Sequence, residues 1–279
     1  MKKALLILFG IAMLSLAGGV LFVRLGAYDI AATESHTRPV YVLMETVMRH
    51  SVRVRADRLT VPPLDAPALA LAGAGCFRQH CLQCHGGPGV APSAVGMSLQ
   101  PLPGSLVDAA RRWRPQDVYW ITRHGIKMSG MPAWELRLAE EQLWAVTAFV
   151  GQLAELSPAG FAQRMREVEG ARCEAAPDAG AQALREYGPR AGAQLLLRQY
   201  ACVGCHRVPG VVGSDTQVGP PLDELSRREF LPGGVPMSRD NLQRWIRAPQ
   251  QLRPGSAMPD LGVSEAHARL MADYLLQDR

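Results

Sequence analysis

Two copies of one cysteine–histidine pattern are the residues of this sequence most able to do chemistry. They read CLQCH at residues 81–85 and CVGCH at residues 202–206. Thiols three positions apart lie about one helical turn from each other. Both can therefore add to the vinyl groups on one edge of a haem, and the adjacent histidine can supply an axial nitrogen to the iron. The pattern predicts two covalently bound haem c groups. The predicted attachment residues are Cys81, Cys84, Cys202 and Cys205, and the predicted axial histidines are His85 and His206.

Other uses of these cysteines explain less of the pattern. A zinc ribbon separates its Cys-x-x-Cys units by about 15–20 residues, whereas Cys84 and Cys202 are more than a hundred residues apart. A thioredoxin-like motif needs a strand–helix–strand pattern, which is missing here. Cys76, Cys81 and Cys84 match a plant-type iron–sulfur spacing. That interpretation leaves the second pattern and both histidines without a role.

A methionine followed by a proline lies on a Gly/Pro-rich stretch downstream of each motif. These residues are Met131 and Met258, 46 and 52 positions after the motif histidines. Proline restrains the residue before it to an extended conformation, so a fixed loop can aim the thioether at the iron. A methionine ligand also raises the reduction potential. We therefore predict Met131 and Met258 as the second axial ligands.

Several other residues compete for the second axial position. Met128 is the main competitor of Met131, and Met97 and Met237 also lie near proline-containing stretches. Bis-histidine ligation is the alternative, but we interpret the five remaining histidines as surface residues. Those histidines are His36, His50, His80, His124 and His267.

The N-terminus predicts a membrane anchor. Lys2 and Lys3 precede Ala4 to Val23, twenty residues without a charge, and Arg24 follows. About 20 apolar residues span a bilayer as a helix, whereas the core of a signal peptide has about 7–15. The lysines favour a cytoplasmic N-terminus, which would place the rest of the chain on the exported side. A long signal peptide that is cleaved near residues 25–27 is the alternative.

Charge and composition exclude some functions. The 279 residues carry a formal net charge of +5, and the propionates of two haems would cancel most of it. The sequence has no run of Lys and Arg that resembles a nucleic-acid patch, so we expect no nucleic-acid partner. Only 6% of the residues are aromatic, and glycine and proline are plentiful. This composition favours compact helical domains with many loops.

The two motifs divide the chain into similar halves. We expect an anchor (or signal peptide) at 1–24, a stalk at 25–65 with an amphipathic helix over 40–54, a first domain at 66–157, a partly helical linker at 158–189 and a second domain at 190–279. The expected helices are 66–85, 114–124 and 139–156 in the first half. In the second half they are 192–206, 240–247 and 264–277.

Both halves resemble the class I cytochrome c fold, over about residues 66–157 and 190–279. Members of that family often carry a glycine eight residues before the first cysteine and an aromatic residue four before it. Gly73 and Phe77 match these positions, and Phe149 and Tyr274 fit the aromatic residue of the last helix. The resemblance implies an all-α protein with two tandem cytochrome c domains preceded by a transmembrane helix.

The second half departs from the family pattern. Gln194 and Arg198 stand where the glycine and the aromatic residue are expected. We therefore expect its helix crossing to be built from Gly192, Leu196 and Tyr200.

The family also implies a proline carbonyl that accepts a hydrogen bond from the ligating histidine. Pro220 fits this role in the second half and Pro103 is our prediction for the first. Cys76 and Cys173 are left over, and two interpretations are open: a disulfide between them in an oxidising compartment, or two buried thiols.

With histidine and methionine on opposite faces, an iron has no open coordination site. We therefore expect an electron carrier and not an enzyme, located at the bacterial inner membrane with its soluble domains in the periplasm. Its partners would be a redox donor and a redox acceptor of a respiratory chain. One alternative is a di-haem subunit of a terminal oxidase or periplasmic dehydrogenase complex, which the amphipathic stretch favours. Another is a di-haem peroxidase, which needs one iron that opens to peroxide.

Overall fold

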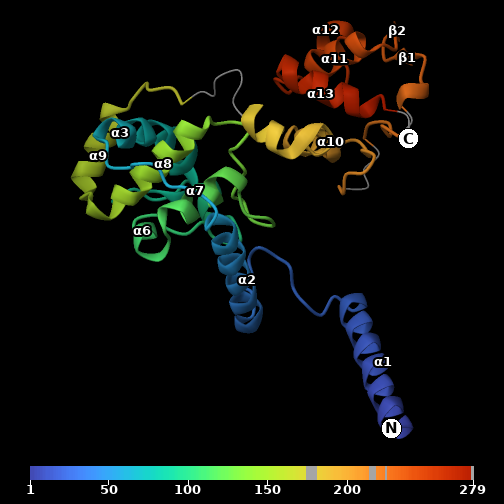
Figure 1. Ribbon diagram of the computed structural model, residues 1–279, viewed down its shortest axis with the longest axis horizontal. Helices are drawn as coiled ribbons and strands as arrows, with labels where there is room; N and C mark the ends of the chain where they lie inside the picture. Colours follow the sequence, from blue (N-terminus) through green and yellow to red (C-terminus); the bar gives the residue numbers. More distant parts are fainter. Residues whose placement is uncertain (174–180, 214–217, 224, 278–279) are drawn as a thin grey trace. The chain divides into compact units, whose positions relative to one another are not determined.

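The computed structural model describes residues 1–173, 181–213, 218–223 and 225–277 (Figure 1). The protein is mostly helical, as the sequence predicts. The strands found in the described residues are β1 (Phe230–Leu231) and β2 (Val235–Pro236), which pair antiparallel with Leu231 opposite Val235. The chain forms two compact units. Unit 1 comprises residues 1–134 and 140–173, and unit 2 comprises residues 135–139 and 174–279.

Helix α1 (Lys2–Arg24) leads unit 1 and has no buried residue. Its 23 residues make a helix about 34 Å long, which exceeds the ~30 Å hydrocarbon core of a bilayer. Among the described residues it is the helix long and apolar enough to cross a membrane. The helix therefore fits a membrane anchor. Helix α2 (Arg38–Ala56) follows and covers the predicted amphipathic stretch.

The centre of unit 1 is the crossing of α3 (Pro67–Cys76) with α8 (Glu140–Gln152). A proline at the first turn starts α3, where the missing N–H costs nothing. A Cβ added at Gly73 would lie 1.9 Å from the carbonyl oxygen of Ala145. The predicted glycine is therefore the residue that lets the two backbones meet. Phe77 packs edge-on against Phe149 at 5.2 Å between ring centroids, which confirms the predicted aromatic pair.

Helix α7 (Pro115–His124) is fixed at its start by a buried carboxylate. Asp117 is 1% exposed, and its side chain accepts from the backbone N–H and the guanidinium of Arg114. Burial alone would raise the pKa of this carboxyl, but the hydrogen bonds from Arg114 outweigh burial and lower it. Arg114 also pairs with Asp57 at 2.7 Å, which ties the end of α2 to the start of α7.

The remaining elements of unit 1 are short. They are the π-helical turn η1 (Phe77–Cys81), α4 (Leu82–His85), α5 (Ala94–Met97), α6 (Ala109–Arg112), the 3₁₀ turn η2 (Leu153–Glu155) and α9 (Pro158–Glu167).

The predicted linker, 158–189, begins in the structure as part of unit 1. Ser157 caps α9 by accepting from the N–H of Gly160, and Phe161 is fully buried against Phe77 and Phe149. Residues 158–173 therefore complete the first core. The sequence did not indicate that this segment belongs to the first core, because α9 is a short helix with few apolar residues. Residues 174–180 of the predicted linker lie outside the described residues.

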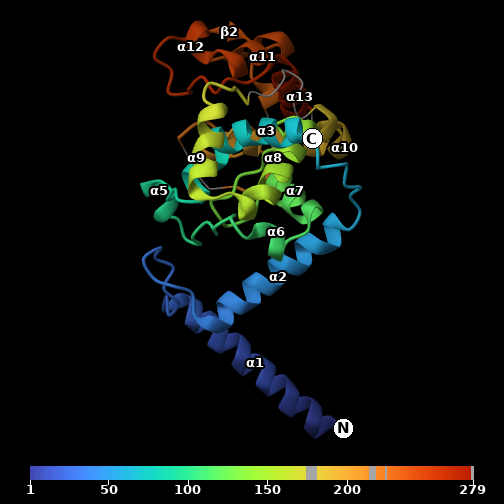
Figure 2. The ribbon, with the colours of Figure 1, turned by 90° about the vertical axis from the view of Figure 1, so that its left-hand side faces the viewer.

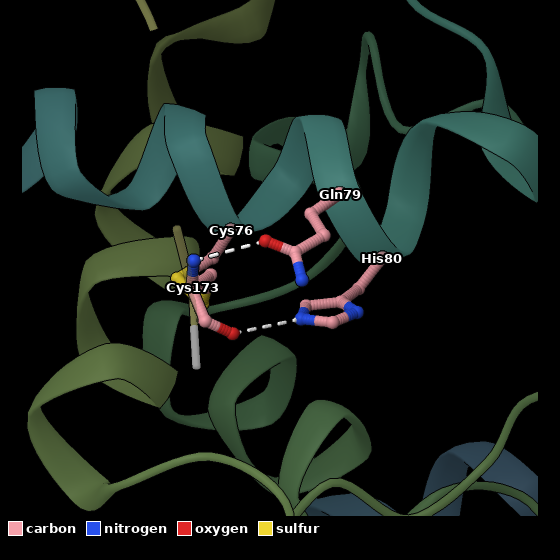
Figure 3. The surroundings of a disulfide bond; sticks show 4 residues. All are labelled: Cys76, Gln79, His80 and Cys173. Atoms are coloured by element: carbon pink, nitrogen blue, oxygen red, sulfur yellow. Dashed lines mark hydrogen bonds between the residues drawn. A yellow bond between two sulfur atoms is a disulfide. The ribbon is translucent and has the colours of Figure 1, made fainter. Parts of the chain in front are cut away.

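A disulfide between Cys76 and Cys173 holds the end of unit 1 onto α3 (Figure 3). Around it, the N–H of Cys173 donates to the side-chain oxygen of Gln79, and Nε2 of His80 is 3.1 Å from the Cys173 carbonyl oxygen. Of the two interpretations left open for these cysteines, the structure shows the disulfide. The bond also removes Cys76 from the iron–sulfur spacing, so that alternative loses one of its ligands.

Unit 2 is built around α10 (Ala181–Gln199), α11 (Arg239–Arg247) and α13 (Glu265–Leu275). Ser264 starts α13 by accepting from the N–H of His267, which confirms the predicted helix start. The shorter elements are the 3₁₀ turns η3 (Cys202–Gly204) and η4 (Leu225–Arg227) and helix α12 (Pro249–Leu252). Figure 2 shows α11, α12 and α13 from a second side. The core residues include Leu196, Leu197, Tyr200, Leu242, Trp245, Ile246, Met271 and Tyr274.

Helix α10 differs from the expected helix over 192–206. It kinks at Gly188, whose φ is 72°, and it ends at Gln199. Ala201 then adopts a left-handed conformation with φ 54°, so the helix does not run into the second motif. The predicted Leu196 and Tyr200 are buried. A Cβ on Gly192 would meet first the ends of the Leu184 and Leu270 side chains, at 3.3 and 3.4 Å, so no close backbone approach depends on this glycine.

Residues 135–139 belong to unit 2 although they lie between α7 and α8 in the sequence. Leu136 joins the core of unit 2. The guanidinium of Arg137 lies 5.1 Å from the ring centroid of Tyr200 and donates to the carbonyl of Gln199. The Tyr187 hydroxyl is 3.2 Å from a carboxylate oxygen of Glu135.

Candidate metal centres

The first motif lies on a run of helix that changes pitch. Helix α3 passes into the π-helical turn η1, which ends at Cys81, and α4 then carries Cys84 and His85. The N–H of Leu82 bonds to the carbonyl of Phe77, five residues back. This turn contains one residue more than an α-helical turn. Phe77 therefore stays in the core, while the side chains after the turn point in a different direction. Turns of this kind often occur at functional sites.

Both motif histidines are held in the same way. Nδ1 of His85 donates to the carbonyl oxygen of Gly104 at 2.8 Å, and Nδ1 of His206 donates to that of Pro220 at 2.8 Å. A neutral imidazole with its proton on Nδ1 leaves the Nε2 lone pair free for a metal. Each histidine is therefore oriented as an axial ligand would be.

The structure confirms one predicted carbonyl and corrects the other. Pro220 accepts from His206, as the resemblance implies. In unit 1 the acceptor is Gly104, the residue after the predicted Pro103. The first half lacks the Gly-Pro-Pro segment of residues 219–221, so its loop offered no second marker to fix the register.

Local packing supports both imidazole rings. Burial lowers the pKa of His85 more than its bond to Gly104 raises it, so the ring is neutral at pH 7 and competent to bind iron. In unit 2 a Cβ on Gly219 would lie 2.3 Å from Cε1 of His206. The backbone of Gly219 therefore packs directly on the imidazole, and any side chain there would displace the ring.

Burial shields one thiol of each motif from ionisation. Burial raises the pKa of the Cys81 thiol to about 12, and Cys84 adds to the effect. Burial also raises the pKa of the Cys202 thiol to about 11. A protonated thiol is a poor nucleophile for disulfide exchange. Burial therefore protects Cys81 and Cys202 from disulfide exchange in the folded chain.

A serine two residues before each methionine fixes the two predicted ligand loops. The N–H of Met131 donates to Oγ of Ser129 at 3.2 Å, and the N–H of Met258 donates to Oγ of Ser256 at 3.2 Å. Sequence reasoning missed these serines. The signal that could have found them is the shared pattern Ser-x-Met-Pro, which occurs at residues 129–132 and 256–259.

The carbonyl groups of the two methionines are also held, each by a different partner. The Met131 carbonyl accepts from the N–H of Ile126 at 3.2 Å. A Cβ on Gly125, whose φ is 66°, would lie 2.7 Å from the same oxygen. The Met258 carbonyl accepts from Nε2 of Gln250 at 2.7 Å. Both methionines are half-buried, on loops whose backbone is fixed at two points.

The competing methionines lie in less suitable places. Met128 is 90% exposed and has a φ of 57°, and Met97 is 58% exposed. Met237 packs against the core of unit 2, as Met258 also does. Exposure therefore favours Met131 over Met128 and Met97, whereas burial does not separate Met258 from Met237. The role of Met131 and Met258 as ligands stays a prediction.

The other histidines have contacts of their own. His80 lies 4.7 Å from the Trp134 ring, and His124 lies 4.8 Å from the Trp120 ring. The prediction that all five are surface residues is wrong for His267. It is 6% exposed and hydrogen-bonded through Nδ1 to the hydroxyl of Tyr200 at 2.9 Å. It occupies the inner face of α13, a face that is otherwise apolar.

The residues predicted to hold each haem c lie within a single unit. Cys81, Cys84, His85 and Met131 belong to unit 1, and Cys202, Cys205, His206 and Met258 belong to unit 2. In the described part of the chain, no three side chains of His, Cys, Asp or Glu gather around a common point. Paired thiols, a histidine with a free Nε2 and a half-buried thioether fit a haem better than a bare metal ion.

Comparison with known proteins agrees with this chemistry. Residues 68–150 match the family described as "Cytochrome C oxidase, cbb3-type, subunit III". A stretch of 81 residues is 36% identical to "Cytochrome c oxidase subunit 2" of Alkalihalophilus pseudofirmus, over 29% of this chain and 23% of that protein. The match thus spans about a quarter of that relative. No solved structure matches the chain. A cytochrome c domain at residues 68–150 supports a c-type cytochrome and implies covalently bound haem c.

Proposed function

We propose that this chain, which carries a cytochrome c domain at residues 68–150, is a membrane-anchored di-haem cytochrome that passes electrons along a respiratory chain on the periplasmic side. The observation that carries the proposal is a repeated pair of contacts. In each unit a backbone carbonyl holds Nδ1 of the motif histidine, and a serine holds the backbone of the Met-Pro loop. Two units with unlike helices share these contacts, which supports the same use of both sites.

The residues of each unit would divide the work of holding a haem. The two motif cysteines would form thioethers that keep the group attached. The histidine would present Nε2 to one face of the iron, and the methionine its sulfur to the other. The group supplies a one-electron change at its iron when bound. Two protein ligands would leave no open position, so the chain would transfer electrons without binding substrate at the metal.

A role as a subunit of a larger oxidase is the second candidate, and the comparisons favour it. Both matches are to proteins described as subunits of a cytochrome c oxidase. In that case the electron transfer would be the same, but the chain would work in a stable complex. Mild detergent extraction, a native gel and haem staining distinguish the two. Migration as a lone chain would count against the subunit role.

Haem content tests the count of two. The purified protein should carry two haems per chain, and colour should remain on a denaturing gel. The double variants C81A/C84A and C202A/C205A should each retain one. If C202A/C205A keeps both haems, or the native chain carries only one, the di-haem proposal is wrong.

Ligation is tested by removing each methionine beside a matched control. M131A and M258A should each lose the ferric absorbance of methionine-ligated haem at one site and bind carbon monoxide there. M128A and M237A, which change methionines placed outside the proposed sites, should keep it. If one haem of the native protein shows no methionine ligation, a closed-site carrier is excluded and a peroxidase-like role is favoured.

A further inference from the structure

The first half of α2 presents large apolar side chains to solvent. Leu43 is 61% exposed, and Met44 and Val47 are 51% and 55% exposed; Val54 near the other end of the helix is 60% exposed. We call these four residues the outer face of α2. A run of exposed apolar side chains on one element marks a surface that binds something.

The outer face lies opposite the side that packs on unit 1. At about 100° of turn per residue, the positions of Glu45, Arg49, Val52 and Ala56 fall on one side of the helix and the outer face on the other. Val52 and Ala56 are buried. Arg49 pairs with Glu45 at 2.6 Å and lies 4.7 Å over the ring of Trp113. The helix is therefore seated by its inner side at Arg49, Val52 and Ala56, whereas its outer face is exposed.

The charge of α2 matches an anionic surface. Helix α2 contains four arginines, Arg38, Arg49, Arg53 and Arg55, against the single acidic residue Glu45. Arg38, Arg53 and Arg55 are exposed. By the same helical spacing Arg55 borders the outer face, whereas Arg38 and Arg53 lie toward the inner side. Arginine can keep its guanidinium among headgroups while its stem follows apolar surface. Apolar side chains flanked by exposed arginines are typical of helices that lie in the membrane interface.

The chain also keeps α2 near a bilayer. Thirteen residues, 25–37, separate the end of α1 from the start of α2. Fully extended, they span at most about 45 Å. If α1 crosses the membrane, α2 starts within that distance of the bilayer surface. A lipid surface is thus always within reach, whereas a protein partner would have to be recruited.

We propose that the outer face of α2 binds the surface of a lipid bilayer containing anionic headgroups. The helix would lie in the interface with Leu43, Met44, Val47 and Val54 toward the acyl chains. Because its other side is packed on α7 and Trp113, this contact would hold unit 1 in one orientation above the membrane. The first CLQCH site would then face partners at a fixed height instead of moving on a free tether.

Photo-crosslinking of the full-length protein in liposomes of phosphatidylcholine and phosphatidylglycerol tests the proposal. The photoreactive residue p-benzoylphenylalanine replaces Leu43 or Val47, with Leu14 in α1 as the lipid-facing reference and Arg58 as the water-facing control. Illumination should give a mass increase of one lipid at positions 43, 47 and 14 and none at 58. A chain–chain adduct at 43 or 47 would show a second copy on this face. It would overturn the proposal, as would the absence of any adduct there.

A matched pair of second-site variants guards against nonspecific capture. With the probe at position 43, V47D should reduce the lipid adduct to the level of position 58, because it places a charge on the outer face. T46D adds the same charge off that face and should leave the adduct unchanged. Equal loss in both variants would contradict the proposal. The readout needs neither haem nor electron transfer, so its failure is distinguishable from failure of the proposed function.

Discussion

Replacing Gly73 with alanine would test how strongly the first site depends on the crossing of α3 and α8. The new Cβ would lie 1.9 Å from the carbonyl oxygen of Ala145. Carbon and oxygen atoms normally approach no closer than about 3.3 Å, so the helices must separate by about 1.4 Å. A gap of about 0.5–1 Å already removes a quarter to a half of the attraction between packed atoms.

The obstacle is rigid backbone, so local relaxation cannot relieve it. Overpacking of a core costs about 1–3 kcal/mol, and we expect G73A to lie near 3 kcal/mol. Gly151 supplies a matched control on α8 itself, because a Cβ there would meet nothing within 4 Å. G151A should stabilise the helix by about 0.5–1 kcal/mol, since alanine loses less backbone entropy on folding.

Hydrogen exchange read by mass spectrometry measures both effects in the intact protein. A loss of about 3 kcal/mol should speed exchange of the α3 and α8 amides about a hundredfold. The amides of α11 and α13 in unit 2 serve as an internal reference and should not change. If the α8 amides exchange no faster in G73A than in G151A, the close approach of the two backbones is not what stabilises unit 1.

Three further changes probe other contacts. Burial lowers the pKa of His267, so the imidazole binds a proton more readily in the unfolded chain, and the native protein loses stability as pH falls below about 6.5. H267Q should lack this contribution to the pH dependence of thermal unfolding between about pH 5 and pH 8. Equal pH dependence in both proteins would refute the role given to His267. The variant C76S/C173S should lose about 3–5 kcal/mol in denaturant unfolding, because the bond joins residues 97 positions apart, and an unchanged midpoint would show that the bond is dispensable. G219A places a Cβ 2.3 Å from the ring of His206, which should displace this proposed iron ligand. The spectrum of one haem should then change from low to high spin while that of the other stays the same. Two unchanged spectra would contradict the packing of Gly219 on His206.

Much of the helical framework follows from the sequence, because its signals are local. Ser264 as a helix cap was readable from residue type, and the resemblance to class I cytochrome c pointed to Gly73, Phe77 and the carbonyl of Pro220. Each depends on a short segment with a strong conformational preference. Local signals of this kind also located the two motifs that we propose to hold haem.

The features that the sequence did not reveal depend on distant parts of the chain. The π-helical turn that ends at Cys81 keeps Phe77 against Phe149 and Phe161. Phe161 lies on α9, which the sequence predicts to be part of the linker. Residues 135–139 read as a loop of the first half, yet Leu136 packs in the core of unit 2. Tertiary packing decided these cases, and no local pattern contains that information.

The Cys76–Cys173 bond has a consequence for the order in which the protein is matured. Cys76 lies five residues before Cys81 in the sequence, whereas its native partner is 97 residues away. Loop closure favours near neighbours in an unfolded chain. In an oxidising compartment, a newly exported chain that oxidised before α9 reached α3 would trap a haem-attachment thiol in the wrong bond. The second motif has no spare cysteine beside it. If both sites bind haem in an oxidising compartment, as proposed, this competition affects the first site during biogenesis and spares the second.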